Sequence, residues 1–398
     1  MIKQIRGEEC LTLRPLWEKV FFEDSREFTD YYFKEKAVRN HAFIILPEEE
    51  AGEARAADIN NENAAAMLHL SPYDMEIRTG NTFTRLEINY IVGVATDEKY
   101  RHRGYMGMLL KASIDYMYKK KQPFTFLMPA SPKIYEPYQF VYIYNKKKYR
   151  VKTEIPQSPN PKAAMADLNG QKKITKLKKQ EIPQLLDYVN FHLHKDYDVF
   201  THRDAAYYNT LVKELKVQNG AVYLISEQES QEADKRIIGY FLYTREGGEE
   251  DIQEAAFGSD AFGKESGFLE EAGDKPIIMA RIVDVQAMLS LLRMKPGHGE
   301  DSRNLILLTI AITDPMIMEN NGIWHCRIGC KESLVQKRTE MDGAPLCSTT
   351  IDKLTSWIFG YKTPEECFIF TQGEIKDEIL CQLESLKLFS NVFINEIV

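Results

Sequence analysis

Arg101 and Arg103 flank His102 in a short basic turn that ends at Gly104, and this turn carries the clearest chemical signal in the chain. The residues before it have the apolar pattern of a buried strand, and from Met106 onward apolar residues recur with helical spacing. The first backbone N–H groups of a helix have no partner within the helix and lie at the positive end of its dipole. With the arginine charges beside them, these groups predict a binding site for a phosphate or pyrophosphate.

Glycine spacing alone does not distinguish such a site from a solvated basic turn, but the surrounding sequence adds two resemblances. The pattern Arg-x-x-Gly after the strand V-G-V-A-T resembles the acetyl-CoA signature of the GNAT acyltransferase superfamily, although Met106 stands where that signature has a small residue. Residues 124–140 resemble the fifth strand of the superfamily and the tyrosine-containing helix that follows it.

The order of segments along nearly the whole chain resembles the enhanced intracellular survival (Eis) type of acetyltransferase. Residues 276–292 and the terminal FINEIV contribute to this resemblance. It implies an α/β (α+β) fold with tandem GNAT-like mixed sheets flanked by helices, followed by a sterol-carrier-like α+β domain. The expected domains are a catalytic GNAT domain at 1–155, a degenerate GNAT-like domain at 156–275 and the sterol-carrier-like domain at 276–398.

Length and composition are those of an ordinary globular protein with two or three domains. The chain has 398 residues, of which 44% are hydrophobic and 28% charged. Its formal net charge of −8 argues against a general nucleic-acid binder, which needs a basic face, and favours cationic partners. The start has no signal-like apolar segment, and the longest apolar run, near 305–312, is too short to span a membrane. We therefore expect a cytoplasmic protein without a membrane span.

The pattern within the chain supports a division into domains. Pro156, Pro159 and Pro161 lie among polar residues and predict a linker at about 155–172. The segments after it follow the element order of a second GNAT-like unit, but no Arg-x-x-Gly turn follows its strands, so we expect no second CoA site. Alternating apolar residues in the third unit predict a half-buried sheet and do not require a lipid ligand.

Cysteine and histidine spacing favours neither a disulfide scaffold nor a metal site. Six cysteines are too few to cross-link a chain of this length, so we expect reduced thiols in the core. Cys326 and Cys330 are four residues apart but lie in a strand-like segment. His192, His194 and His202 do not share one face of the preceding amphipathic helix, and we expect no metal there.

The resemblance implies acetyl-CoA as co-substrate and assigns residues to it. In the superfamily the strand that holds Val92 and Val94 splays from its neighbour, so these residues would line the pantetheine arm. The backbone N–H of Val94 would stabilise the oxyanion. The expected contacts to acetyl-CoA are made by Val92, Val94, Arg101, His102, Arg103, Gly104, Tyr105, Met106 and Gly107.

Tyr135 matches the position of the superfamily's general acid. A phenol with a pKa of about 10 stays protonated at neutral pH and can donate a proton to a departing thiolate. Tyr138 follows three residues later and better fits a ring packed under the helix. The residues alone do not choose between the two tyrosines, and the resemblance selects Tyr135.

No histidine or glutamate stands out as the base that deprotonates the amine. The Eis resemblance implies that the chain's own terminal carboxylate, on Val398, enters the active site of the first domain. A free terminal carboxyl has a pKa of about 3.3–3.7, so partial burial or a bridging water would have to assist it. The alternative is a frayed tail, which is common at chain ends, but the apolar FINEIV disfavours it.

The acceptor is the part of the reaction that the sequence defines least. Asp24, near the first helices, and Glu396, beside the terminus, could attract a cation. We expect an N-acetyltransferase that transfers acetyl directly to a primary amine of a cationic small molecule or peptide, such as an aminoglycoside, a polyamine or a lysine side chain. The alternative is a non-catalytic acyl-CoA sensor or lipid carrier. The resemblance also implies a homo-oligomer, with a hexamer favoured.

Overall fold

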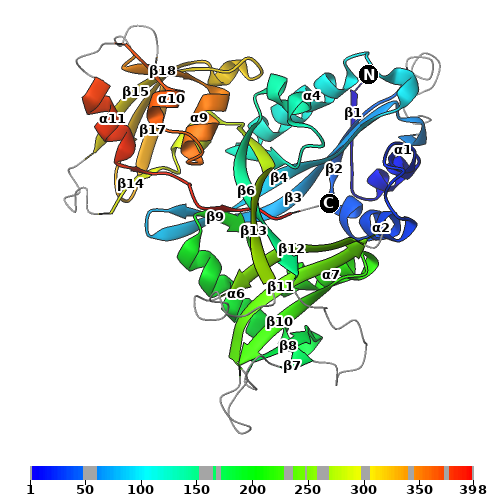
Figure 1. Cartoon of the computed structure of the whole chain (residues 1–398). Coiled ribbons are helices and arrows are strands. Elements are labelled where there is room, and N and C mark those ends of the chain that lie inside the picture. The colour runs from blue at the N-terminus through cyan, green and yellow to red at the C-terminus, as the bar shows by residue number, and fades with distance from the viewer. Residues whose placement is uncertain are drawn as a thin grey trace.

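The described residues form three larger β-sheets and one two-stranded sheet. We call the regions built around the three larger sheets, shown in Figure 1, the first, second and third domains. The computed structural model describes residues 2–47, 61–151, 165–166, 172–227, 236–246, 249–257, 269–296, 305–338, 345–371 and 376–396. The predicted architecture of mixed sheets flanked by helices, with a C-terminal α+β domain, is confirmed. Within these residues, no helix is long and apolar enough to cross a membrane.

The first domain is built on a nine-stranded sheet. Its main path runs β1-β2-β3-β4-β5-β13-β6, and β9, which pairs with β3, also pairs with β21. The pairs β4–β5 and β21–β9 are parallel, whereas the other pairs are antiparallel. The strands are β1 (Ile2–Arg6), β2 (His41–Ile45), β3 (Ala66–Thr79), β4 (Thr82–Thr96), β5 (Phe124–Leu127), β6 (Val141–Val151), β9 (Val199–Thr201), β13 (Leu269–Ile282) and β21 (Val392–Phe393).

Helices flank this sheet and begin at recognisable sequence signals. Ser25 caps α2, because its hydroxyl accepts a hydrogen bond from the Phe28 N–H at 3.1 Å. The helix expected near Gly104 is confirmed as α4, which buries Leu109 and Ile114 against the sheet. The helical segments are η1 (Gly7–Leu13), α1 (Arg14–Val20), α2 (Arg26–Tyr31), η2 (Tyr32–Lys36), η3 (Ala37–Arg39), η4 (Asn61–Asn63), η5 (Glu98–Tyr100), α4 (Tyr105–Lys119), α5 (Pro132–Tyr135) and η6 (Glu136–Tyr138).

The second domain has a five-stranded antiparallel sheet in the order β12-β11-β10-β8-β7. Its helices pack on this sheet through a stripe that includes Leu185 and Val189. The linker expected at 155–172 lies largely outside the described residues. The elements are β7 (Met165–Ala166), β8 (Lys172–Lys176), η7 (Lys179–Glu181), α6 (Ile182–Asp196), α7 (Ala205–Val217), β10 (Ala221–Glu227), β11 (Arg236–Glu246) and β12 (Glu249–Phe257).

The third domain has a five-stranded sheet in the order β17-β16-β15-β18-β19, in which only β15 and β18 are parallel. A separate short pair joins β14 (Arg293–Met294) and β20 (Leu386–Lys387). The other elements are α8 (Val285–Leu289), β15 (Ile306–Thr313), η8 (Met318–Asn320), β16 (Gly322–Ile328), β17 (Ser333–Lys337), β18 (Cys347–Thr350), α9 (Ile351–Ile358), α10 (Pro364–Cys367), β19 (Ile369–Phe370) and α11 (Lys376–Glu384).

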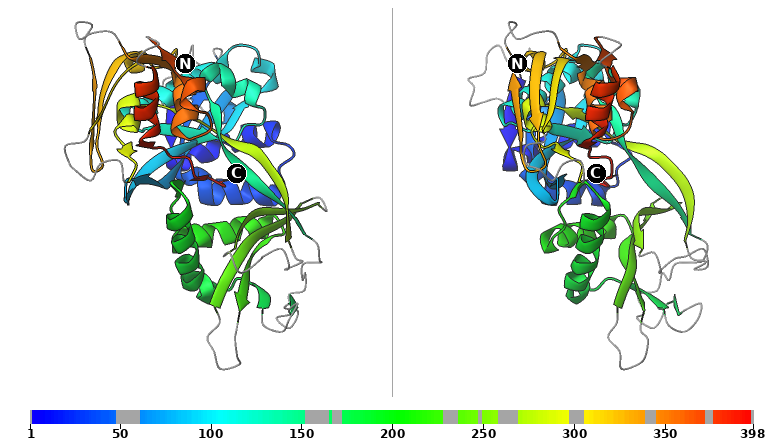
Figure 2. Two further views of the ribbon diagram at one scale, coloured as in Figure 1. Left: turned by 60° about the vertical axis from the view of Figure 1, so that its left-hand side comes forward. Right: turned by 90° about the vertical axis from the view of Figure 1, so that its left-hand side faces the viewer.

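Strand β13 returns from the second domain and completes the sheet of the first. It lies between β5 and β6, with Ala280 opposite Phe126 on one side and Val141 on the other. Figure 2 shows the long ribbon of β6 and β13 running between the first domain and the second. Because β13 spans Leu269–Ile282, it crosses the boundary expected after residue 275. This pairing joins segments far apart in sequence, so local patterns could not indicate it.

The first and third domains share one hydrophobic core. The rings of Phe124, in β5, and Phe359, after α9, meet edge to face with centroids 5.2 Å apart. Buried apolar side chains continue without interruption from the first sheet to the third. The second domain has clusters of its own. The third domain is therefore packed against the first as part of the same structural unit.

Candidate functional site

Strands β4 and β5 run parallel to each other but separate after a single paired position. Both strands lie wholly within the described residues, and they pair only at Tyr90 and Phe126, whose ring centroids are 5.1 Å apart. Beyond Tyr90, backbone groups on this edge of β4 are not taken up by β5 and can meet a ligand. The divergence agrees with the splayed strand that the resemblance implied for Val92 and Val94.

A β-bulge shapes the same part of β4. Met67 pairs with Ala95 whereas His69 pairs with Val92, so β4 has one residue more than β3 over this stretch. Gly93 lies in the bulge with a φ of 60°, and a Cβ there would lie 2.4 Å from the Trp17 ring. Only glycine fits this position. Gly93 is not among the predicted site residues, although a glycine inside a strand pattern is a recognised sign of a bulge.

The basic turn is exposed at the N-terminus of α4. His102 and Gly104 both have left-handed backbones, with φ values of 64° and 76°. A Cβ on Gly104 would meet no atom within 4 Å, so the space before the helix is open. The Arg103 guanidinium lies 5.3 Å from the centroid of the Tyr100 ring, and Arg101 is exposed beside it. Exposed cations, unpaired helix N–H groups and open space suit a pyrophosphate.

The first turn of α4 also packs against the turn that follows Tyr135. A Cβ at Gly107 would lie 2.7 Å from the Tyr138 hydroxyl, so glycine at this position makes room for that ring. Tyr105 and Met106 are half-buried against the core. Packing against the core therefore accounts for Met106 at a position where the acetyl-CoA signature usually has a small residue.

Tyr135 is held near the divergence of β4 and β5. It ends α5, is 8% exposed, and has its ring centroid 6.0 Å from that of Phe140. Burial raises the pKa of Tyr135 to about 12 and so keeps the phenol protonated at neutral pH. Burial is also the main cause of the raised pKa of Tyr90, to which Tyr73 and Tyr135 add.

A cavity of about 240 Å³, here called the acidic cavity, lies between the first and second domains. Five carboxylates line it against three lysine or arginine side chains, so its charge favours a cation. Lys36 and Glu214 form a buried ion pair at 2.7 Å on its wall. Its charged and histidine residues are Glu35, Lys36, Arg39, Asp74, Arg85, His202, Asp204, Glu214 and Glu396.

Tyr73 connects the acidic cavity with the divergence of β4 and β5. It lines the cavity, and its ring centroid is 6.1 Å from that of Tyr90. Burial raises the pKa of Tyr73 well above its usual value, and Glu396 and Glu214 raise it further. The position of Tyr73 in this cavity could not be predicted from the sequence, because a tyrosine within a long strand gives no chemical signal of its own.

The two predicted acceptor carboxylates have different settings. Glu396 lines the acidic cavity, is 6% exposed, and lies 3.3 Å from the Tyr207 hydroxyl, which donates to it, and 3.7 Å from Arg203. Burial is the main cause of its raised pKa. Asp24 does not line this cavity. It accepts a hydrogen bond from the Trp17 indole at 2.9 Å, and burial is the main cause of its raised pKa.

The C-terminal segment leads towards the acidic cavity. Val392 and Phe393 form β21, which pairs with β9, and Asn395 donates to the Gln253 carbonyl at 2.6 Å. Asn395 and Glu396 both line the acidic cavity. Val398 lies outside the described residues, so its role as base stays a prediction.

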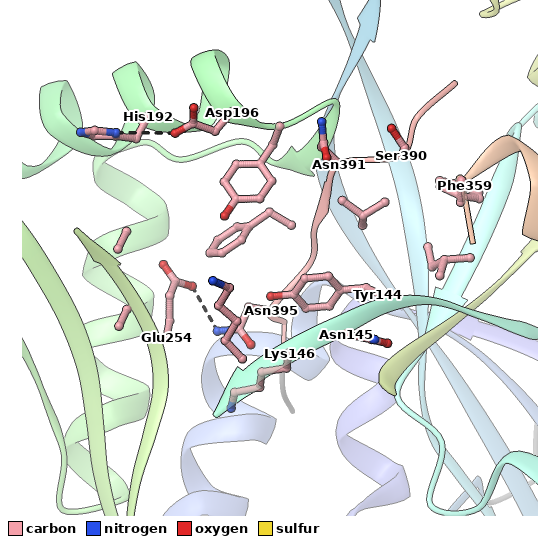
Figure 3. Close-up of a pocket in the computed structure, with 18 of the residues that line it drawn as sticks. Tyr144, Asn145, Lys146, His192, Asp196, Glu254, Phe359, Ser390, Asn391 and Asn395 are labelled. Carbon is pink, nitrogen blue, oxygen red and sulfur yellow. Dashed lines mark hydrogen bonds and ion pairs between the residues drawn. The ribbon is translucent and has the colours of Figure 1, made fainter. Parts of the chain in front are cut away.

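A larger cavity of about 640 Å³, here called the junction cavity, lies where the three domains meet. Figure 3 shows Lys146, Glu254 and Asn395 close together on its wall, with Asn395 donating to Glu254 at 3.2 Å. None of the predicted site residues lines it, but Gln253 and Asn395 also line the acidic cavity. The two cavities thus adjoin each other at Gln253 and Asn395.

The thiols and histidines take no part in a metal site within the described part of the chain. Cys10, Cys326, Cys347 and Cys367 are buried as expected, but Cys330 and Cys381 are exposed, so the expectation of core thiols was wrong for these two. No disulfide joins the six cysteines, all of which are described. His194 and His202 both bond to Glu76, at 2.7 and 2.5 Å. These two histidines join the second domain to β3.

Two segments of the chain match known protein families. Residues 2–143 match the acetyltransferase (GNAT) domain, and residues 285–391 match the sterol carrier protein domain. A search of curated proteins gave no significant match.

Solved structures share this fold along the whole chain. A probable N-acyltransferase from Enterococcus faecalis V583 has a TM-score of 0.71 at 16% identity, with 100% of this chain and 99% of that chain covered. A GCN5-related N-acetyltransferase from Anabaena variabilis has a TM-score of 0.68 at 14% identity, with both chains covered in full. Eis1 from Mycobacterium abscessus has a TM-score of 0.65 at 10% identity, again with 100% of each chain covered.

Proposed function

We propose that this protein, an Eis-like enzyme that joins a GNAT acetyltransferase domain to a sterol carrier protein domain, acetylates a primary amine of a cationic acceptor. The observation that carries the proposal is that three features lie around the place where β4 and β5 separate. These are the basic turn of α4, the buried Tyr135 and the acidic cavity, which Tyr73 links to Tyr90. Acetyl-CoA is the co-substrate of this enzyme class and supplies the acetyl group.

The residues of the first domain bind and orient the donor. Arg101 and Arg103, with the N–H groups of the first turn of α4, hold the pyrophosphate through charge-assisted hydrogen bonds. The divergent edge of β4 at Val92 and Val94 offers backbone groups to the pantetheine arm. The N–H of Val94 donates to the thioester oxygen as negative charge develops on it.

Transfer then needs two protons removed from the ammonium nitrogen and one supplied to the departing thiolate. The amine nitrogen forms a bond to the acetyl carbon, and the carbon–sulfur bond breaks. Tyr135 gives its proton to the departing thiolate, a role that suits a phenol whose pKa burial raises to about 12. The terminal carboxylate of Val398 takes the first ammonium proton, directly or through water, before the attack. The nitrogen loses its second proton after the attack, and that proton restores the Tyr135 phenol.

The acceptor enters through the acidic cavity. Its excess of carboxylates favours an amine with more than one positive charge, such as a polyamine, an aminoglycoside or a lysine-containing peptide. Glu396 lines the cavity from the C-terminal segment, is 6% exposed, and is our choice for acceptor contact. Asp24 accepts a hydrogen bond from the Trp17 indole and does not line this cavity, so its contact with the acceptor stays a prediction.

The decisive test compares two tyrosines in one assay. We expect Tyr135→Phe to keep fold and acetyl-CoA binding while turnover on a panel of cationic amines falls by about 10²-fold or more. Tyr138→Phe is the matched control, since it removes a hydroxyl only three residues away. Loss of turnover in the Tyr138 variant alone would show that the acid is misassigned. Acetyl-CoA binding without turnover on any amine would favour the alternative, an acyl-CoA sensor.

We further propose a homo-oligomer, with a hexamer favoured. Large apolar side chains are exposed on both the first and third domains, including Phe22 at 77%, Met318 at 72% and Ile369 at 68%. Such side chains are suited to subunit contacts. The cytoplasmic location stays a prediction.

A further inference from the structure

We propose, on the basis of the role proposed for Tyr135, that the sterol carrier protein domain is a working part of the acetyl-transfer site. Through a buried ion pair between Arg281 and Asp314, it holds the turn that carries Tyr135 in place. Arg281 and Asp314 are then positioning residues. The third domain would contribute to the reaction in this way without carrying a lipid.

Arg281 connects two domains through separate nitrogens of one guanidinium. It lies on β13, within the first sheet, and its side chain is 0% exposed. Its Nη1 donates to the Tyr138 carbonyl at 2.8 Å, and its Nη2 donates to Asp314 Oδ1 at 2.5 Å. One planar group therefore holds a backbone carbonyl of the first domain and a carboxylate of the third at a fixed separation.

Asp314 is itself held firmly by the third domain. It follows β15, and its side chain is 0% exposed. Its oxygens accept hydrogen bonds from the Met316 N–H at 2.9 Å, the Ile317 N–H at 3.2 Å and the Asn320 side-chain amide at 2.8 Å. A carboxylate with this many donors cannot turn away, so Arg281 has a rigid anchor.

The carbonyl that Arg281 holds belongs to the segment that sets the position of Tyr135. Tyr138 ends η6, which continues directly from the last residue of α5, Tyr135. The Phe140 N–H donates back to the Tyr135 carbonyl at 3.4 Å, so this turn is closed on itself. The Tyr138 ring meets Gly107 of α4. Arg281 therefore acts on a turn that also touches the helix of the cofactor site.

Stability alone gives little reason for such a pair. Removing two charges from water costs several kcal/mol per ion, and apolar residues of similar volume often replace a buried pair without loss of stability. The pair instead fixes the position of the turn. Position matters because a displacement of about 1 Å in a catalytic group can lower the rate 10²-fold. The shared core already holds the two domains together, which leaves the ion pair to fix the turn.

Arg281→Lys tests the proposal, because lysine keeps the charge but cannot donate along two fixed directions at once. We expect turnover to fall between about 10- and 100-fold, while the affinity for acetyl-CoA changes by less than threefold. Combined with Tyr135→Phe, Arg281→Lys should cause little further loss, because it acts through Tyr135. An equal loss in both backgrounds would mean a merely structural role and would overturn the proposal.

Arg78→Lys is the matched control. Arg78 also donates to a carboxylate, Asp198 at 3.1 Å, and to backbone carbonyls, including that of Tyr197 at 2.9 Å, but it joins the first domain to the second. Its effect on turnover should be the same with and without Tyr135. Should Arg281→Lys not fold, Asp314→Asn provides the second variant, since the amide keeps one acceptor oxygen for Arg281.

Hydrogen exchange gives a readout that does not depend on the acid. Amides of residues 134–140 should exchange at least tenfold faster in Arg281→Lys and unchanged in Arg78→Lys. Unchanged exchange in Arg281→Lys would overturn the positioning role. If Tyr135→Phe retained full activity, the assignment of the acid would fail, and faster exchange at 134–140 would still show that Arg281 holds this turn.

Discussion

The hydroxyl of Tyr138 lies against the backbone of Gly107, so close that a Cβ on Gly107 would be 2.7 Å away. The contact joins the turn after Tyr135 to the first turn of α4. The family resemblance implied that Gly107 contacts acetyl-CoA. Its packing against Tyr138 is a second and sufficient reason for glycine at this position, and the two reasons can be separated by mutation.

Gly107→Ala should crowd the Tyr138 hydroxyl and destabilise the protein by about 1 kcal/mol, at the low end for overpacking, because the obstructing atom is the end of a side chain. Tyr138→Phe removes that atom and should restore most of the loss. Denaturant unfolding of the two single variants and the double variant measures this coupling. If the double variant is no more stable than Gly107→Ala, crowding by the hydroxyl is not the cause.

Local pattern predicted several elements around the proposed acetyl-CoA site. The strand before the basic turn and the start of α4 near Gly104 depend on neighbouring residues, and both are confirmed. The short helix ending at Tyr135 was implied by the family resemblance and is also confirmed. The bulge at Gly93 could have been inferred from a glycine within a strand. These features depend on the spacing of apolar residues and on turn-forming residues, and both can be read directly from a single sequence.

Long-range pairings could not be predicted in this way. β13 inserts between β5 and β6 although it lies more than a hundred residues further along the chain, and Arg281 meets Asp314 across a domain boundary. Tyr73 becomes part of the acidic cavity only because the second domain closes over it. A buried arginine and a strand tyrosine look ordinary in sequence, and their significance depends entirely on their distant partners.

Replacing both Arg101 and Arg103 with alanine should weaken acetyl-CoA binding by one to two orders of magnitude, about 1.5–3 kcal/mol in all for charge-assisted hydrogen bonds. Stability should hardly change, since both side chains are exposed. Isothermal titration at two salt concentrations would measure the affinity and its electrostatic part. Arg236→Ala, at an exposed arginine of the second domain, is the control. Unchanged affinity for acetyl-CoA in the double variant would show that the two arginines do not bind the pyrophosphate.

Glu396→Gln should change how stability depends on pH. Burial raises the pKa of Glu396, so its contribution to stability is fully present below the ordinary value, near 4.5, and is lost as pH rises through the folded-state pKa. Glutamine does not titrate, and the variant should gain stability relative to the parent between acidic and neutral pH. Melting temperatures across this range would show the trend.

Glu35→Gln provides a control of opposite sign. The hydrogen bond from Lys213 lowers the pKa of Glu35 in the folded state. This carboxylate therefore contributes stability at pH values above its ordinary pKa, and the contribution is lost as pH falls through the lowered folded-state pKa. The Glu35 variant should therefore lose stability relative to the parent as pH rises. Parallel curves for the parent and Glu396→Gln would contradict the shifted pKa of Glu396.

Light scattering should give a mass six times that of the 46.0-kDa chain if the favoured hexamer forms. Replacing the exposed Phe22, Met318 and Ile369 with serine in separate variants would identify which domain supplies the contacts. Each change removes apolar surface without disturbing a core. A monomer at micromolar concentration would contradict the proposed assembly.

Extending the C-terminus by two glycines should abolish most turnover while leaving the fold intact. The tail is fixed by the pairing of β21 with β9, by the bond from Asn395 to Gln253 and by the burial of Glu396, and none of these involves the last carboxylate. Two added residues move that carboxylate by up to about 7 Å and put an amide in its former place. A base must lie within about 2.6–3.2 Å of its proton, or one water away, so the rate should fall by at least tenfold. The same two glycines added before Met1 are the control, with acetyl-CoA affinity and melting temperature measured in both. A normal rate in the C-terminal extension would exclude the terminal carboxylate and leave Glu396 or an ordered water as the base.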